Sequence, residues 1–307
     1  MSAISSDVHS PTMSLIVAVY DPPVDVLRIQ LESIAAQTSD DWECVVVDDA
    51  SSSSAVIAFI DAWCAISDRR RLIRRAVNGG IAAATNDGID AATGEFLAIC
   101  DHDDVVHPTA VEALLDHFRA HPNHDVAYTD EQLIDDSGFV LAPYRKPDYS
   151  PIRHLGHHYL AHLVAARRSA VGELRVDARF EPAQDYDFYL RVIERVRAAH
   201  RGVGHVPTIL YSWRAIEGSS ALDAAEKPEM ASAVARCVNA AIDRRQLDLI
   251  ASTVVHDGMP TTSVRLELPA VDSAVAKVPI DASTSPVEVA DLIERTDEPV
   301  ILSLIHI

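Results

Sequence analysis

The sequence predicts an α/β fold in which a mostly parallel central sheet carries helices on both faces. Short apolar runs alternate with helical patterns four times before residue 120, the order that produces parallel strands joined by helices. Polar or glycine-rich segments follow these runs, and ligands bind beyond the carboxyl ends of strands in such sheets. With 307 residues, 48% of them apolar, the chain can bury a large core and form one large or two ordinary domains.

Four strands and four helices are predicted in the first part of the chain. Apolar runs typical of strands buried on both faces occupy residues 15–19, 42–47, 71–76 and 96–100. Apolar residues at helical spacing predict helices at residues 24–34, from the 51–54 turn to about 66, at 81–92, and from 108 onward. Asp21 is predicted to cap the first helix, with Pro22 at its first position.

The alternation becomes less regular after residue 125. The remaining predictions are a strand at 126–129, a hairpin turn at 135–138, irregular chain at 143–151, a helix from 185, a strand at 205–211 and a helix at 228–249. We therefore expect one domain over residues 14–225, followed by a helical extension over 226–250.

The two ends of the chain differ from this domain. Residues 1–13 lack the basic and apolar regions of a signal peptide and are predicted to be a disordered tail. Residues 251–301 read as the start of a second, truncated α/β module. Residues 302–307 match one reading frame of a common sequencing adapter, so we expect the natural sequence to stop near residue 301.

Charge and composition exclude several functions. Lys and Arg number 26 against 46 Asp and Glu, a net charge of −20, which disfavours binding to nucleic acid or to anionic lipid. No apolar stretch reaches the length of a transmembrane segment. The four cysteines form no C-x-x-C pair and are expected to be reduced, which fits the cytoplasm. An anionic substrate would need local neutralisation, for which a divalent metal is the obvious candidate.

The strongest candidate for a metal site is the run Asp101-His102-Asp103-Asp104, directly after the fourth strand. Carboxylates at alternate positions can share a hard cation such as Mg²⁺ or Mn²⁺ with substrate phosphates. The alternative is a solvated acidic turn before the next helix. Asp48-Asp49 and the Asn78-Gly79-Gly80 break, expected at the same edge of the sheet, favour the metal site.

A second acidic cluster, Gln184-Asp185-Tyr186-Asp187, opens a helix in the second half of the chain. An acidic residue there can simply complement the helix dipole. If its carboxylate faces the cleft, Asp185 could instead act as a general base. Metal-bound carboxylates could not easily fill that role, because the cation holds them ionised and occupied.

These motifs, taken in order, resemble family 2 glycosyltransferases of the GT-A fold. The segments that carry the resemblance are 45–51, 78–82, 94–104, 184–191, 205–207, 210–214 and 219–220, so that it covers residues 14–222. The later segments are similar to bacterial O-antigen and cell-wall members of rhamnosyl- or galactosyltransferase type. The resemblance implies a GT-A fold for residues 14–225.

The resemblance also implies roles for individual residues. The donor would contact Tyr20, Asp21, Asp48, Asn78, Gly79, Asp101, Trp213 and Arg214. Asp101 and Asp103 would form the D-x-D pair, with Asp103 the direct ligand of Mn²⁺ or Mg²⁺. Asp185 would take the proton of the acceptor hydroxyl. Two positions depart from the usual pattern: Gln184 replaces a glutamate, and Asp21 replaces an asparagine.

The predicted activity is metal-dependent, inverting transfer of a sugar from a nucleotide-diphosphate donor to a hydroxyl of a glycan or lipid-linked acceptor. The expected location is the cytoplasm, with the inner face of the membrane as a further option, and the full-length chain could carry a second transferase module. The alternatives are a non-catalytic sugar-nucleotide-binding module and a nucleotidyltransferase. The latter would need a glycine-rich basic loop after the first strand, where this chain has Asp21-Pro22-Pro23.

A row of histidines remains open to several interpretations. His154, His158 and His162 recur at every fourth position and would align on a helix. They could bind a metal, line the acceptor cleft, or make hydrogen bonds in the core or at the surface.

Overall fold

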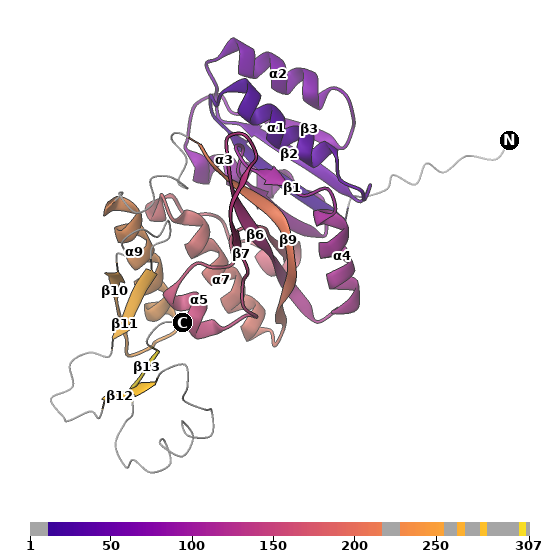
Figure 1. Cartoon of the computed structure of the whole chain (residues 1–307). Helices are drawn as coiled ribbons and strands as arrows, with labels where there is room; N and C mark the ends of the chain where they lie inside the picture. The colour runs from indigo at the N-terminus through magenta and orange to yellow at the C-terminus, as the bar shows by residue number, and fades with distance from the viewer. Residues whose placement is uncertain (1–11, 217–227, 255–262, 268–276, 281–300, 305–307) are drawn as a thin grey trace. The chain divides into compact units, whose positions relative to one another are not determined.

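The computed structural model contains a nine-stranded sheet flanked by helices (Figure 1). It describes residues 12–216, 228–254, 263–267, 277–280 and 301–304. The strand order is β3-β2-β1-β4-β8-β6-β9-β5, and β7 pairs with β6 outside this path. Six of the nine strands, β1 to β4, β6 and β9, run in the same direction. The predicted mostly parallel α/β sheet, consistent with a GT-A fold, is therefore confirmed.

The first part of the chain forms the predicted alternation. The strands are β1 (Met13–Val19), β2 (Trp42–Asp48), β3 (Arg70–Arg74) and β4 (Phe96–Cys100), and all their pairings are parallel. The helices are α1 (Val24–Ala35), α2 (Ser54–Cys64), α3 (Ile81–Ala91) and α4 (Ala110–Ala120). Every residue of β2 is buried, because helices cover both faces of the sheet here.

The second part departs further from the predictions. It contains β5 (Val105–Val106), β6 (His124–Asp135), β7 (Val140–Tyr144), α5 (Pro151–Gly156), β8 (Val164–Arg167), α6 (Arg168–Val171), a 3₁₀ turn (Ala178–Phe180), α7 (Gln184–Ala198) and β9 (Gly202–Ala215). Strand β6 continues well beyond the predicted residues 126–129. Its polar residues Asp130 and Glu131 are buried in the sheet against their interaction partners, a position that their polarity alone does not predict. Strand β8 was not predicted: its residues Val-Ala-Ala-Arg show no alternation, and only pairing with β4 and β6 makes them a strand.

Two apolar clusters form the core on the two faces of the sheet. One contains residues of α1, α2 and α4, including Leu31, Ile60 and Leu114. The other contains residues of α3 and α7, including Ile89 and Val192. The alternating strand residues supply both clusters, since successive side chains point to opposite faces.

The chain after β9 divides between two compact units. Helix α9 (Pro228–Arg244) belongs to the large unit, and β10 (Ile250–Val254) pairs with β11 (Ser263–Glu267). The small unit comprises Asp248–Ile250 and Leu266–Ile307, and in it β12 (Lys277–Ile280) pairs in parallel with β13 (Ile301–Leu304). Of the predicted tail over 1–13, residues 1–11 lie outside the described residues, whereas Met13 already belongs to β1, where it pairs with Trp42. The predicted helix near 285–293 also lies outside the described residues, and the predicted domain boundaries stay predictions. Among the described helices, none combines the length and the apolar character needed to cross a membrane.

Candidate active site

The predicted site residues gather where parallel strands end. Residues Val19 of β1 and Asp48 of β2 are paired in register, and β4 ends beside them at Cys100, one residue before Asp101. Strand β9 reaches the same region through Tyr211, whose hydroxyl oxygen accepts a hydrogen bond from the backbone N–H of Asp101 at 3.2 Å. The carboxyl edge of the sheet therefore carries the candidate site, as the sequence predicts.

A buried glutamine fixes the loop that carries the D-x-D motif. Gln30 of α1 is fully buried, and its Nε2 donates a hydrogen bond to the carbonyl of Asp101 at 2.6 Å. Together with the Tyr211 hydroxyl, this contact satisfies the backbone of Asp101 and leaves its carboxylate partly exposed. The loop is thus held by its main chain while its carboxylates remain available.

Three side chains form the one group in the described part of the chain with the ligand spacing of a metal site. One ligand atom each from Asp101, Asp104 and His162 lies within 4.8 Å of the others. Asp104 is fully buried, yet its Oδ2 makes no hydrogen bond, and burial together with the Asp101 carboxylate raises its pKa well above the usual range. A buried carboxylate oxygen without a partner is unfavourable unless a cation or proton is present, so these residues fit a divalent metal.

His162 is oriented by a pair of buried charged residues. Its backbone N–H donates to Oε2 of Glu131 at 2.5 Å, and its carbonyl accepts a hydrogen bond from Nζ of Lys146 at 2.5 Å. The ring stacks on Tyr211 at 5.0 Å between centroids, and its Nε2 lies 3.3 Å from Asp101 Oδ2. Burial alone would lower the pKa of His162, but hydrogen bonds to Asp101 and Glu131 raise it well above its usual value. The same acidic pocket that favours this protonated ring would favour a cation in its place.

The structure places Asp103 and Arg214 differently from the predicted D-x-D arrangement. Asp103 is not in the three-residue group, although burial and the charge of Asp101 raise its pKa. Arg214 is buried: its NH1 donates to the carbonyl of Asp103 at 3.3 Å, and its NH2 contacts Asp136 at 3.1 Å. Its guanidinium therefore ties the metal loop to the β6–β7 turn, and its backbone N–H donates to Asp104 Oδ1 at 2.9 Å. Direct metal binding by Asp103 and donor contact by Arg214 stay predictions.

Asp185 lies near this cluster and is paired with a histidine. Its Oδ2 is 3.0 Å from Nε2 of His158, whose ring stacks on Tyr186 at 4.6 Å between centroids. Burial would raise the pKa of Asp185, but His158 lowers it below the usual value. Burial raises the pKa of the Tyr189 phenol well above its usual value, and the charges of Asp185 and Asp101 raise it further. His158 and His162 lie four residues apart in the chain and contact Asp185 and Asp101 respectively, so one short segment connects the candidate base with the metal loop.

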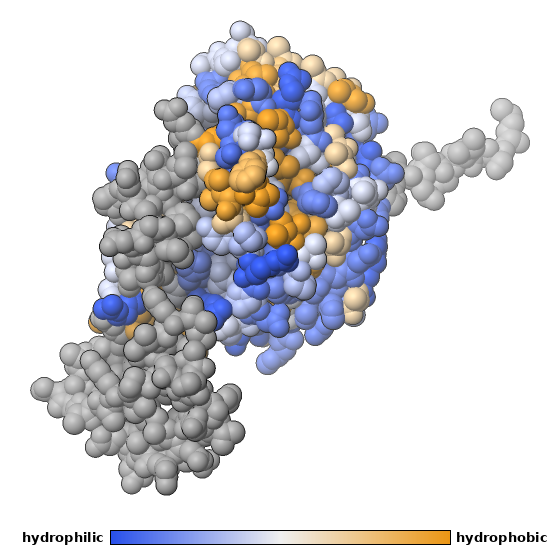
Figure 2. All heavy atoms as spheres, viewed as in Figure 1, coloured by the Kyte–Doolittle hydropathy of each residue, from blue (hydrophilic) through white to orange (hydrophobic). Residues whose placement is uncertain are grey.

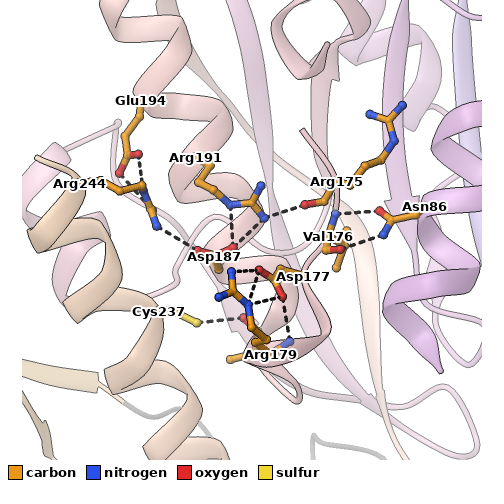
Figure 3. Close-up of polar contacts among 11 residues, drawn as sticks. Asn86, Arg175, Val176, Asp177, Arg179, Asp187, Arg191, Glu194, Cys237 and Arg244 are labelled. Atoms are coloured by element: carbon orange, nitrogen blue, oxygen red, sulfur yellow. Dashed lines mark hydrogen bonds and ion pairs between the residues drawn. The ribbon is translucent and has the colours of Figure 1, made fainter. Parts of the chain in front are cut away.

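The neighbouring Asp187 has a purely structural environment (Figure 3). It is fully buried between two guanidinium groups: Arg191 lies 2.7 Å from its Oδ2 and Arg244 lies 3.3 Å from its Oδ1. Arg244 also reaches Glu194 at 2.8 Å, so the cluster joins α7 to α9. Of the two aspartates in this motif, one faces the candidate site and the other ties two helices together.

The Asp48-Asp49 pair and the glycine break form a connected polar framework. Asp48 is fully buried, accepts the backbone N–H of Ser51 at 2.9 Å and lies 2.9 Å from Nε of Arg74. Burial raises its pKa, but the Ser51 and Arg74 contacts outweigh that effect and lower it. The Asp49 carboxylate accepts the backbone N–H groups of Gly79 and Gly80 at 2.9 and 2.8 Å. These glycine amides therefore bind a carboxylate of the chain itself, and donor contacts by Asp48, Asn78 and Gly79 stay predictions.

Asp21 does not cap the first helix. Helix α1 begins at Val24 with Pro23 in the cap position. The Asp21 carboxylate instead accepts the backbone N–H groups of Ser52 and Ser53 at 3.0 and 2.8 Å, and these bonds lower its pKa. Asp21 adopts a φ of 46°, which turns the chain after β1 toward the loop before α2. The neighbouring Tyr20 is 53% exposed and free to contact a ligand.

The three histidines at every fourth position do not align on one helix, because α5 ends at Gly156. His154 is fully buried among aromatic rings, and burial lowers its pKa well below the usual value. His158 pairs with Asp185, and His162 pairs with Asp101. Sequence reasoning missed Glu131 and Lys146 entirely, since a buried Glu and Lys 15 positions apart give no local pattern.

Comparisons with known proteins point in one direction. A family model described as glycosyl transferase family 2 matches residues 14–171. The uncharacterized protein y4gI of Sinorhizobium fredii is 37% identical over 72% of this chain, and the O-antigen biosynthesis protein RfbC of Myxococcus xanthus is 34% identical over 69%. The chain spans only 24% and 16% of these relatives.

Solved structures are similar in fold. The structure of S. aureus TarS residues 1–349 in complex with UDP-GlcNAc aligns with a TM-score of 0.58 and 18% identity, covering 75% of this chain and 66% of that one. A second structure of TarS residues 1–349 aligns with a TM-score of 0.56 and 19% identity over 75% of this chain and 65% of that one. At this level of identity the likeness establishes the arrangement of the chain alone.

Proposed function

Because the chain belongs to glycosyl transferase family 2, we propose that it transfers a sugar from a nucleotide-diphosphate donor to a hydroxyl group of an acceptor. The family expected from the motifs is confirmed by the match over residues 14–171. The observation that supports the proposed activity is that His158 and His162, four residues apart in the chain, contact Asp185 and Asp101 respectively. A transferase of this kind needs both groups, one for the leaving diphosphate and one for the incoming alcohol.

The Asp101 cluster would hold Mn²⁺ or Mg²⁺. Asp101, Asp104 and His162 offer two carboxylates and an imidazole, and Asp103 could add a third carboxylate from the same loop. Oxygen ligands suit both cations, and the free Asp104 Oδ2 supports a ligand role. When bound, the cation would neutralise negative charge that develops on the departing diphosphate.

Asp185 would act as the general base. Its pairing with His158 lowers its pKa, so the carboxylate is ionised and able to accept a proton at neutral pH. The acceptor oxygen would attack the anomeric carbon from the face opposite the diphosphate, which gives a single displacement with inversion. Tyr20 and Trp213, one exposed and one half-buried, offer aromatic faces for the nucleoside or sugar.

The acceptor would be a glycan or a lipid-linked glycan. Figure 2 shows apolar side chains gathered over the β6–β7 hairpin, where Phe139, Val140 and Leu141 are exposed. The same hairpin is tied to the metal loop through Asp136 and Arg214. An apolar surface beside the site is compatible with an acceptor that has an apolar part.

We also propose that the chain is part of a longer protein and that this protein is located in the cytoplasm. Relatives several times longer fit a second transferase module in the full-length protein, with residues 251–301 as its start. The free cysteines Cys44, Cys64, Cys100 and Cys237 support a cytoplasmic location, with the inner face of the membrane as a second option.

The test is an assay of sugar transfer with a panel of nucleotide-sugar donors and Mn²⁺. We expect release of nucleoside diphosphate that depends on acceptor, and a product whose anomeric configuration is opposite to that of the donor. Donor binding without any turnover would favour the non-catalytic binding module. Release of pyrophosphate in a parallel reaction that supplies a nucleoside triphosphate and a sugar phosphate would favour a nucleotidyltransferase. Retention of configuration would reject Asp185 as the base of a single displacement.

A further inference from the structure

Three histidines cluster at the edge of the sheet opposite the candidate active site. His117 and His121 come from the last turn and the cap of α4, and His124 begins β6. His124 is at the amino end of β6, seven residues before Glu131, which contacts His162 at the site end of the strand. The cluster is therefore distinct from the Asp101 group.

Two of these imidazoles already have the spacing of a ligand pair. Nε2 of His117 lies 3.0 Å from Nδ1 of His124. Two nitrogens bound to one Zn²⁺ at about 2.0–2.1 Å are separated by roughly 2.9–3.4 Å at angles between square and tetrahedral. The present N···N separation therefore already falls in the range that a shared metal ion requires, and small rotations of the two rings would turn their lone pairs from each other toward the ion.

His121 is placed to supply a third ligand. Its ring centroid is 4.7 Å from that of His117 and 5.0 Å from that of His124, on which it stacks. The three ring nitrogens do not converge as the side chains stand. Because His121 is exposed at the end of α4, rotation about its side-chain bonds could complete the set without moving the backbone.

The neighbouring strand β9 has glycines where it packs against this cluster. A Cβ atom added at Gly204 of β9 would lie 2.0 Å from His117 Nε2 and 2.5 Å from His124 Nδ1. At Gly202 it would lie 2.4 Å from His124 Cδ2. Gly204 thus lies against the paired ring nitrogens and Gly202 against the other side of the His124 ring, so a larger residue at either position would displace these rings.

The imidazole ligands of the cluster suit a metal ion that is intermediate between hard and soft. Burial, followed by the charges of His121 and His124, lowers the pKa of His117 to about 4, and burial also lowers the pKa of His124. Both rings are therefore neutral at pH 7, the form that binds metals. Asp125, the residue after His124, is engaged by Arg167 and Arg201 at 2.8 Å each. An all-imidazole set favours Zn²⁺, Ni²⁺ or Cu²⁺ over Mg²⁺ or Mn²⁺.

We propose that His117, His121 and His124 form a binding site for a zinc-class divalent cation, separate from the site for the catalytic cation. Bound metal would join the end of α4 to the start of β6 and would stabilise the fold by mass action. Water would occupy the remaining coordination positions. The inference does not depend on the proposed transferase activity.

The test is calorimetric titration of the metal-free full chain with ZnCl₂. To weaken metal binding at the other site, the titration uses the Asp101→Asn background. We expect one equivalent of Zn²⁺ to bind, with no comparable binding of MgCl₂, and a rise in melting temperature with zinc. His121→Asn and His117→Asn should each weaken zinc binding at least tenfold, whereas the matched control His107→Asn, an exposed histidine just before the same helix, should not.

The His121→Asn variant protects the test against misfolding, because the His121 side chain is exposed at the end of α4. Co²⁺ absorption gives a second readout, since nitrogen ligation changes its visible spectrum. Equal zinc affinity in the Asp101→Asn protein and in both cluster variants made in that background would overturn the proposal. So would the absence of zinc binding in the Asp101→Asn background.

Discussion

Nε2 of His158 lies 3.0 Å from Oδ2 of Asp185, at the start of α7. The histidine is itself held by stacking on Tyr186. This contact holds the carboxylate in one orientation and favours its ionised form. The candidate base is therefore a pair of side chains, and each member can be tested separately.

The first prediction concerns Asp185→Asn. The amide keeps the shape and can still contact His158, but it cannot accept the acceptor proton. We expect transfer to fall by about 10²- to 10⁴-fold, the usual contribution of a general base, with donor affinity unchanged. Steady-state kinetics and donor titration measure the two effects. Asp187→Asn is the comparison within the same motif, and equal loss of kcat per folded molecule in both variants would contradict the assignment.

The second prediction concerns pH. His158 lowers the pKa of Asp185 against the effect of burial, so in His158→Leu burial should dominate and that pKa should rise. Because the base works only when ionised, the acidic limb of the kcat profile should move to higher pH. A pH profile of kcat checks this shift. The exposed His200→Asn serves as control, since asparagine tolerates the φ of 54° at that position; an unshifted limb in His158→Leu would reject the pairing.

The third prediction concerns the metal. Asp101 belongs both to the D-x-D pair and to the group with Asp104 and His162. We expect Asp101→Asn to weaken Mn²⁺-dependent donor binding by about tenfold or more, because a lost carboxylate ligand removes both charge and a coordination position. Titration of donor with and without chelator measures this. Asp116→Asn, an exposed carboxylate on α4, should behave as wild type, and unchanged metal dependence in Asp101→Asn would exclude this loop as the site.

The fourth prediction concerns stability. Asp187→Asn would leave Arg191 and Arg244 without their buried partner. Removing one member of a buried pair is strongly destabilising, but both arginines are partly exposed, so we expect a loss of about 2 kcal/mol in the free energy of unfolding. Denaturant unfolding measures it. Asp177→Asn, whose partner Arg179 is 82% exposed, should change stability much less; equal losses would contradict the structural role of Asp187.

Particular elements explain how far the sequence could predict the fold. The apolar run of β2 is buried on both faces and needs no partner to be recognised as a strand. Strand β8, with its Val-Ala-Ala-Arg sequence, becomes a strand only because β4 and β6 lie on either side. The polar end of β6 could not be predicted for the same reason, since its partners lie far away in the chain.

By itself, the sequence determined the strand–helix alternation, the edge at which the site lies and the residues Asp101, Asp103 and Asp185 as its candidate centre. Those features depend on local patterns, which apolar periodicity and short motifs record directly. The tertiary structure alone decided that Asp104 and His162 join Asp101, that His158 pairs with Asp185, and that Asp21 and Asp49 bind the chain's own amides. These contacts join residues that are distant in sequence. The group that pairs with a carboxylate is therefore determined by the folded arrangement and not by the neighbouring residues in the chain.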